Sequence, residues 1–249
     1  MDQAMLEYAA ATQQAILRIY QWSKPTISLG YFQDFEGLVE FPELKTLDCV
    51  RRVTGGGAIL HDRELTYSIA IPAENHHKGH SAILYRAVHQ AIIEWLQGFG
   101  FSANLWKEVN QELDGSYPKE ESFLCFERRS EVDIVVDNRK IVGSAQRRTS
   151  NGLLQHGSLL MESSSWLPQL KGLYTEACGK PYAFSETTVA AIELGETLGE
   201  TLKCALEDAF GFQWSGTFAG ESVCARARTI AKEQFSSVGW TQFRGRPSG

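Results

Sequence analysis

The sequence lacks the features that mark several large classes of protein. Its 249 residues contain no apolar run long enough to cross a membrane, so we expect no membrane partner. Lys and Arg number 24 against 30 Asp and Glu, the net charge is -6, and no basic run interrupts this balance. A nucleic-acid partner is therefore not expected. Segment 1–7 carries acidic residues where a secretory signal needs basic ones, which predicts a cytoplasmic protein.

Metal and disulfide patterns are also missing. The cysteines form an odd set without a Cys-x-x-Cys pair: Cys49, Cys125, Cys178, Cys204 and Cys224. This spacing favours a reducing compartment over a disulfide framework or a zinc site. The histidines of segment 76–80 have no carboxylate or thiolate nearby and precede a predicted helix. We interpret that segment as an exposed loop and assign no metal.

Hydrophobic residues make up 43% of the chain, enough for a sizeable core. A period of two predicts strands and a period of 3.6 predicts helices. The predicted strands are 16–22, 26–31, 49–53, 58–61, 65–71, 131–136, a strand beginning at residue 140, and 152–161, and the predicted helices are 2–14, 36–47, 81–99 and 188–210. Hairpin-length links dominate, so we expect an α+β fold with a mixed, mostly antiparallel sheet flanked by helices. We predict one domain over 1–240 and a disordered tail over 241–249.

Two reactive side chains stand close together in the middle of the sequence. Cys125 precedes a predicted strand, and Lys140 begins the return strand after Asp137-Asn138, a dipeptide that tolerates a left-handed turn. A thiolate is the reactive form of cysteine, and a nearby cation favours it. The pair therefore predicts a nucleophile and its base, although a cysteine beside Phe126 also fits a small buried residue, and a strand lysine is commonly solvated.

Glycine-rich segments on both sides of this pair predict a binding cavity. Gly55-Gly-Gly57 allows backbone N–H groups to approach a ligand, but it is no P-loop, because an apolar strand follows instead of Gly-Lys-Ser/Thr and a helix. A strained turn is the alternative interpretation. Gly143-Ser-Ala145 follows the lysine directly and offers a second oxyanion site. Segment 155–158 also places a polar pair and a glycine inside an apolar run, so we expect it to line the same cavity. The polar segment 110–121 predicts a mobile lid.

The motifs resemble those of the biotin/lipoate ligase (BPL/LPL) and octanoyltransferase superfamily, in its lipoate branch. The matching segments are Arg51-Arg-Val-Thr-Gly-Gly-Gly-Ala-Ile-Leu-His-Asp62, Arg139-Lys-Ile-Val-Gly-Ser-Ala145, His156-Gly-Ser-Leu-Leu160, Ser28-Leu-Gly-Tyr-Phe-Gln33 and Glu64-Leu-Thr-Tyr-Ser68. They cover about residues 2–161. Cys125-Phe126 ahead of the lysine resembles the LipM type of octanoyltransferase. Two departures stand out: the family strand that precedes the first helix has no counterpart, and the loop reads Gly-Gly-Gly where members often have Gly-Gly-Arg.

The resemblance implies acyl transfer in two steps with Cys125 and Lys140 as catalytic residues. Octanoyl would pass from acyl carrier protein to Cys125 as a thioester, and then to a lysine of a lipoyl domain such as the glycine cleavage H protein. No cofactor is expected. The substrate-binding residues implied by the motifs are Arg52, Gly55, Gly56, Gly57, His61, Gly143, Ser144, Ala145, Gln146, His156 and Gly157. From sequence alone, His61 also fits a hydrogen-bonded structural role.

Three other functions stay open at this point. The first is a lipoate-protein ligase, which needs ATP and magnesium but no thiol. The second is an amidotransferase that moves octanoyl between lipoyl domains through Cys125. The third is a non-catalytic binder of acyl carrier protein or lipoyl domains, which would leave the pairing of Cys125 with Lys140 unexplained.

Overall fold

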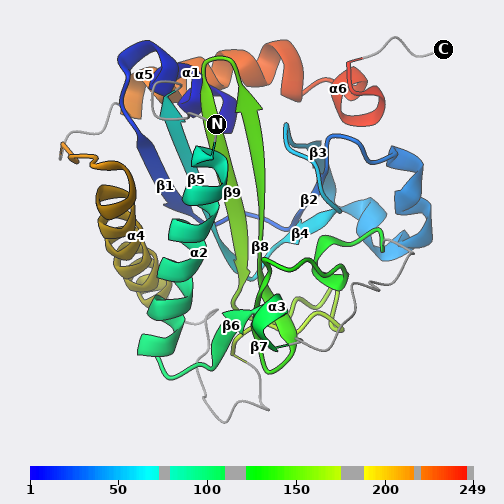
Figure 1. Ribbon diagram of the computed structural model, residues 1–249. Coiled ribbons are helices and arrows are strands. Elements are labelled where there is room, and N and C mark those ends of the chain that lie inside the picture. The colour runs from blue at the N-terminus through cyan, green and yellow to red at the C-terminus, as the bar shows by residue number, and fades with distance from the viewer. Residues whose placement is uncertain (73–78, 110–121, 175–187, 216–219, 246–249) are drawn as a thin grey trace.

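A six-stranded antiparallel sheet forms the centre of the molecule (Figure 1). The computed structural model describes residues 1–72, 79–109, 122–174, 188–215 and 220–245. The sheet has the strand order β1-β5-β9-β8-β7-β6. Its strands are β1 (Ile16–Tyr20), β5 (Glu64–Pro72), β6 (Ala103–Leu105), β7 (Ile134–Val136), β8 (Arg139–Thr149) and β9 (Gly152–Leu160). The predicted predominance of antiparallel pairing is confirmed.

A second sheet of three strands lies beside the first. In it β2 (Thr26–Leu29) pairs in parallel with β3 (Asp48–Arg51) and antiparallel with β4 (Ile59–His61). The chain therefore passes from β3 through the glycine loop to β4 across the central strand β2. The order of strand, glycine loop and strand is confirmed, and the two strands flanking the loop are not direct neighbours.

Helices cover both faces of the large sheet, which explains why every residue of β5 is buried. On one face, α2 (His80–Gly98) and α4 (Thr188–Phe210) pack against Ile69 and Ile71. On the other face, α1 (Asp2–Thr12) and α5 (Gly220–Ile230) pack against Ala70. Successive residues of a strand point to opposite faces, so one strand contributes to two cores.

The predicted helix 36–47 is helical but 3₁₀ in type, and the break that Pro42 predicts is confirmed. The segment forms two 3₁₀ helices, Phe35–Glu40 and Pro42–Thr46, separated at Phe41. Proline disfavours helical conformation in the residue before it, and its ring blocks the hydrogen bond that would continue the first helix. The remaining helical segments are α3 (Trp106–Val109), the 3₁₀ turn Cys125–Glu127, the π-helix Ala231–Phe235 and α6 (Val238–Phe243).

The predicted domain boundary after residue 240 falls inside α6. This helix continues to Phe243, and Arg244 forms an ion pair with Asp34, so residues 241–245 do not form the expected disordered tail. Residues 246–249 lie outside the described part of the chain, as does the predicted lid 110–121. In the described residues, no helix combines the length and the apolar character that a bilayer crossing requires.

Candidate active site

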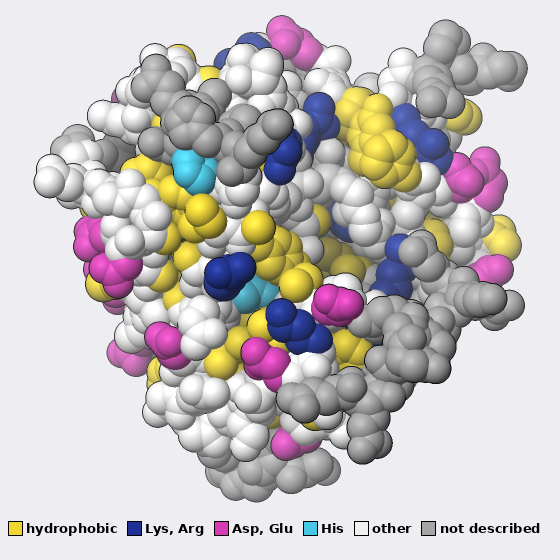
Figure 2. All heavy atoms as spheres, in the orientation of Figure 1, with side chains coloured by type: hydrophobic (Ala, Val, Ile, Leu, Met, Phe, Trp, Pro, Cys, Tyr) yellow, Lys and Arg dark blue, Asp and Glu magenta, His cyan; other side chains and the backbone are white. Residues whose placement is uncertain are grey.

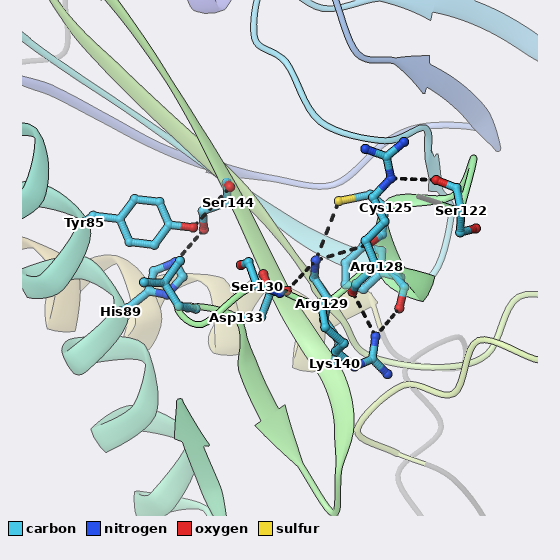
Figure 3. A network of polar contacts seen from close by, with 12 residues as sticks. Tyr85, His89, Ser122, Cys125, Arg128, Arg129, Ser130, Asp133, Lys140 and Ser144 are labelled. Atoms are coloured by element: carbon cyan, nitrogen blue, oxygen red, sulfur yellow. Dashed lines mark hydrogen bonds and ion pairs between the residues drawn. The ribbon is translucent and has the colours of Figure 1, made fainter. Parts of the chain in front are cut away.

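Cys125 and Lys140 meet as the sequence predicts. The Lys140 Nζ atom lies 3.8 Å from Cys125 Sγ and donates a hydrogen bond of 3.1 Å to Cys125 O (Figure 3). The lysine is 6% exposed, so its ammonium group is held close to the thiol and largely away from water. A cation at this distance stabilises a thiolate, the form that attacks a carbonyl carbon.

The thiol is not held by the hairpin itself. Cys125 begins a 3₁₀ turn ahead of β7, and its amide donates to Ala58 O at 2.8 Å. Ala58 in turn donates to Phe123 O at 2.8 Å and forms a parallel bridge with Leu124. The main chain after the glycine loop therefore fixes the position of the nucleophile, while β8 supplies the lysine.

A β-bulge directs Lys140 toward Cys125. Val135 of β7 pairs with Lys140, but Ile134 pairs with Val142, so Ile141 is an extra residue in β8. Ile141 and Val142 consequently both pack into the core beneath α2. Lys140 lies on the other side with Gly143, where a Cβ atom would approach Lys140 Cε to 2.9 Å and Cys125 Sγ to 3.7 Å. Bulges near active sites commonly re-aim a side chain in this way.

Asp133 is a third member of this group that the motifs did not reveal. Its carboxylate forms an ion pair with Lys140 at 2.9 Å and accepts a hydrogen bond of 2.7 Å from Ser130 N. Both side chains of the pair are 4% exposed. A buried ammonium group needs such a partner, because removing it from water is costly. Asp133 therefore holds Lys140 in place with its charge balanced.

Arg52 clamps the glycine loop instead of pointing free donors at a ligand. It donates to Gly55 O and Gly57 O, each at 2.8 Å, and to Ser28 O at 2.7 Å. Burial lowers the pKa of Arg52 to about 10, which the nearby Cys125 opposes. At neutral pH the guanidinium therefore remains charged close to the thiol. Gly57 packs against the Cys125 backbone, where a Cβ atom would come within 2.8 Å of the amide nitrogen.

A cavity of about 420 Å³ opens beside the thiol, within the range of roughly 300–1,000 Å³ common for small-molecule sites. Ten of the predicted site residues line it: Arg52, Gly55, Gly56, His61, Cys125, Gly143, Ser144, Ala145, His156 and Gly157. Its apolar walls come from Tyr20, Trp22, Val50, Val53, Ile59 and Phe235. On the face drawn in Figure 2, hydrophobic side chains gather near the centre, with Lys, Arg, His and acidic side chains beside them. Such a cavity suits an apolar chain that ends in a polar group.

Both cavity histidines are fixed by carboxylates, of which Glu64 is buried and Asp2 is half-buried. His61 Nδ1 lies 2.5 Å from Glu64 Oε1, and its ring stacks on Trp22 at 4.1 Å between centroids. His156 contacts Asp2 at 2.7 Å through Nδ1 and Thr54 at 2.6 Å through Nε2. Burial alone would raise the pKa of Asp2, but the hydrogen bond from His156 keeps it well below its usual range. These contacts orient both rings along the cavity wall.

The family model for the lipoyl protein ligase A/B catalytic domain matches residues 1–197. The chain belongs to this family. It is 36% identical to octanoyltransferase LipM of Geobacillus kaustophilus over 243 residues, which cover 96% of this chain and 86% of that protein. It is 35% identical to octanoyltransferase LipM of Staphylococcus aureus over 167 residues, or 65% of this chain. The match spans only 60% of the length of the Staphylococcus aureus protein.

Solved structures show that the fold is shared across the family. Lipoate-protein ligase A bound with ATP superposes with a TM-score of 0.64 at 19% identity, covering 96% of this chain and 92% of that one. A bi-partite lipoate protein ligase from Thermoplasma acidophilum gives a TM-score of 0.62 at 19% identity, covering 98% of this chain and 92% of its own. At this identity the likeness concerns the fold alone.

Gln146 is the predicted site residue that the structure places elsewhere. Its amide donates to Gln155 at 2.7 Å and to Ser81 O at 2.8 Å, and it is not among the described residues that line the cavity. Gly57 and Lys140 are also outside the lining, although both contact Cys125. Within the described part of the chain, no three His, Cys, Asp or Glu side chains gather in a way that could hold a metal.

His89 supports the site from α2 and was not identified from the sequence. Its Nδ1 donates to Val132 O at 2.8 Å, and its Nε2 lies 2.7 Å from Ser144 Oγ. Burial lowers the pKa of His89 to about 4, so the ring is neutral near pH 7 and Nε2 accepts from the serine hydroxyl. Tyr85 donates to Ser144 O at 3.2 Å. Ser144 is therefore held on both its side chain and its backbone (Figure 3).

Proposed function

We propose that the chain is a protein octanoyltransferase that carries the acyl group on Cys125. The single observation that supports this most directly is the 3.8 Å approach of Lys140 Nζ to Cys125 Sγ at the edge of a cavity with apolar walls. A ligase that forms an acyl-adenylate needs no thiol at this position. The names of the octanoyltransferase LipM relatives, at 35% and 36% identity, agree with a transferase function.

In the first half-reaction, the Cys125 thiolate attacks the carbonyl carbon of octanoyl held as a thioester on acyl carrier protein. The C–S bond to the carrier breaks, and the departing sulfur takes the proton from the Lys140 ammonium group. Backbone N–H groups of the glycine loop or of Gly143-Ser-Ala145 would stabilise the oxyanion, since both segments line the cavity. The product is octanoyl-Cys125 and the free thiol of the carrier.

In the second half-reaction, the amine of a lysine on a lipoyl domain attacks octanoyl-Cys125. Lys140, now neutral, accepts the proton that the amine loses, and the Cys125 thiolate leaves. The enzyme returns to its starting protonation state, and the thioester of the carrier protein supplies the driving force for forming the amide. The glycine cleavage H protein is the acceptor that we propose, because the resemblance to the LipM type implies it.

The proposal is tested by intact mass spectrometry of the protein after incubation with octanoyl-acyl carrier protein and no ATP. We expect one octanoyl adduct on the wild type, none on Cys125→Ala, and an unchanged adduct on Cys204→Ala, whose thiol is exposed on α4. Lys140→Ala should form the adduct far more slowly. Normal acylation of that variant would reject the role assigned to the lysine.

Two competing functions give different results when ATP, the acyl donor and the acceptor are varied. A ligase would modify a lipoyl domain only with ATP present, and Cys125→Ala would retain that activity. An amidotransferase would acquire its adduct from octanoyl-H protein and not from the carrier protein. Either result would replace the function proposed here.

A further inference from the structure

The C-terminal residues 220–245 lie beyond the segment that the family model matches, yet they reach the cavity. Phe235 is the residue of this segment that appears in the cavity wall. It packs against the same hydrophobic cluster as Val53, which follows β3 and also lines the cavity. The cavity is therefore completed by a part of the chain outside the matched domain.

The segment is fastened to β3 by reciprocal hydrogen bonds. Trp240 Nε1 donates to Arg51 O at 2.9 Å, and Arg51 Nε donates to Thr241 O at 2.9 Å. Trp240 is 8% exposed and packs with Val53 in the core that α1 and α5 share. Arg51 directly precedes the arginine that clamps the glycine loop. Phe235 is consequently held by a rigid neighbour of the site.

A local departure from α-helical geometry places the Phe235 ring. Residues Ala231–Phe235 form a π-helix that continues α5 directly, closed by a 2.8 Å hydrogen bond from Ser236 N to Ala231 O. The wider turn changes the direction of the residues that follow α5. The phenyl ring packs against the Trp240 ring at 5.0 Å and 71°. Single π-turns of this kind are rare in proteins, and those that do occur are often found at functional sites.

We propose that Phe235 is a specificity-determining residue that closes one apolar end of the cavity and limits the length of the acyl chain. This inference rests on the proposed function, because it takes the cavity as the site of the acyl group. A rigid aromatic wall sets a fixed end for a flexible chain, since a longer chain must displace the ring or leave methylenes in water. Each additional methylene that is buried in the cavity favours the longer acyl chain over the shorter one about fourfold.

The experiment compares acylation of Cys125 from octanoyl-, decanoyl- and dodecanoyl-acyl carrier protein. We expect Phe235→Ala to raise the ratio of decanoyl to octanoyl rates about fifteenfold over the wild type, the value for two additional buried methylenes. Phe235→Leu, which keeps an apolar wall of smaller size, should give a smaller shift in the same direction. The matched control is Val238→Ala, since Val238 is 65% exposed on the same segment and should leave the ratio unchanged.

The outcomes separate this inference from the proposed function. If the wild type forms an octanoyl adduct but the ratio is the same in all variants, Phe235 does not limit the chain. If octanoyl and decanoyl rates fall together, the ring serves only to maintain the fold, and the inference is overturned. If no thioester forms on the wild type, the proposed function fails. In that case, direct calorimetric binding of octanoic and decanoic acids to wild type and Phe235→Ala still decides whether the ring limits chain length.

Discussion

Replacing Asp133 by Asn should separate the contribution of its charge from that of its shape. The substitution leaves an acceptor for Ser130 N but removes the negative charge 2.9 Å from Lys140 Nζ. Both side chains of the pair are 4% exposed, so the ammonium group would be left buried without its counter-charge. Breaking such a pair costs about 3–5 kcal/mol. Because the backbone hydrogen bond survives, we expect about 3 kcal/mol, a large part of the 5–15 kcal/mol typical of a domain.

Two measurements check this expectation. Urea unfolding at pH 7 gives the loss of stability, and the rate of Cys125 alkylation by iodoacetamide gives the loss of thiol reactivity. We expect alkylation to slow at least about tenfold, because Lys140 loses the carboxylate that holds its ammonium group beside the thiol and no longer stabilises the thiolate. The matched control is Asp137→Asn, since Asp137 is a 63% exposed turn residue whose positive φ of 50° suits asparagine equally well. Wild-type stability together with wild-type alkylation in Asp133→Asn would refute the role given to the carboxylate.

Two further predictions concern the surroundings of the reacting pair. Burial lowers the pKa of His89 to about 4. As the pH falls from about 6.5 to about 4, His89 is therefore protonated in the unfolded chain but stays neutral in the folded protein. Stability should drop by about 3 kcal/mol across this window in the wild type but not in His89→Gln, and parallel pH–stability curves would contradict this. Gly143→Ala should slow thioester formation more than tenfold, because its Cβ would lie 2.9 Å from Lys140 Cε and displace the ammonium group from the thiol. Gly98→Ala, with no atom within 4 Å of its Cβ, is the control, and equal rates in both variants would argue against the close packing at Gly143.

Local signals in the sequence predicted much of the scaffold. Asp137 and Asn138 adopt φ values of 50° and 59°, as the turn between β7 and β8 requires. The helical spacing of 81–99 yields α2, whose buried residues form one face against the sheet. These features depend on residues near one another in the chain, and periodicity or turn chemistry reveals them.

Long-range contacts explain what the sequence could not predict. His89 contacts Ser144 across 55 positions, and its place on the buried face of α2 does not reveal this distant partner. Phe235 reaches the cavity from a π-helix, and the periodicity of its sequence does not mark that irregular turn. Asp133 is a polar residue inside the predicted apolar strand 131–136. Because a buried lysine needs a counter-charge, that position could have identified Asp133 as the partner of Lys140. The motif predicts Gln146 as a substrate-binding residue, but its amide bonds to Gln155 and Ser81 and does not line the cavity.

The extra residue in β8 shows why the placement of Lys140 could not follow from strand periodicity. In a regular strand, residues 140 and 143 would point to opposite faces, because their separation is odd. The bulge at Ile141 reverses this relation and brings the lysine to the side of Gly143, where the thiol lies. The cost is a local loss of regular pairing, which the burial of both Ile141 and Val142 in the same core offsets. The geometry of the pair is thus set by main-chain irregularities on both sides, the bulge for the amine and the parallel bridge between Ala58 and Leu124 for the thiol.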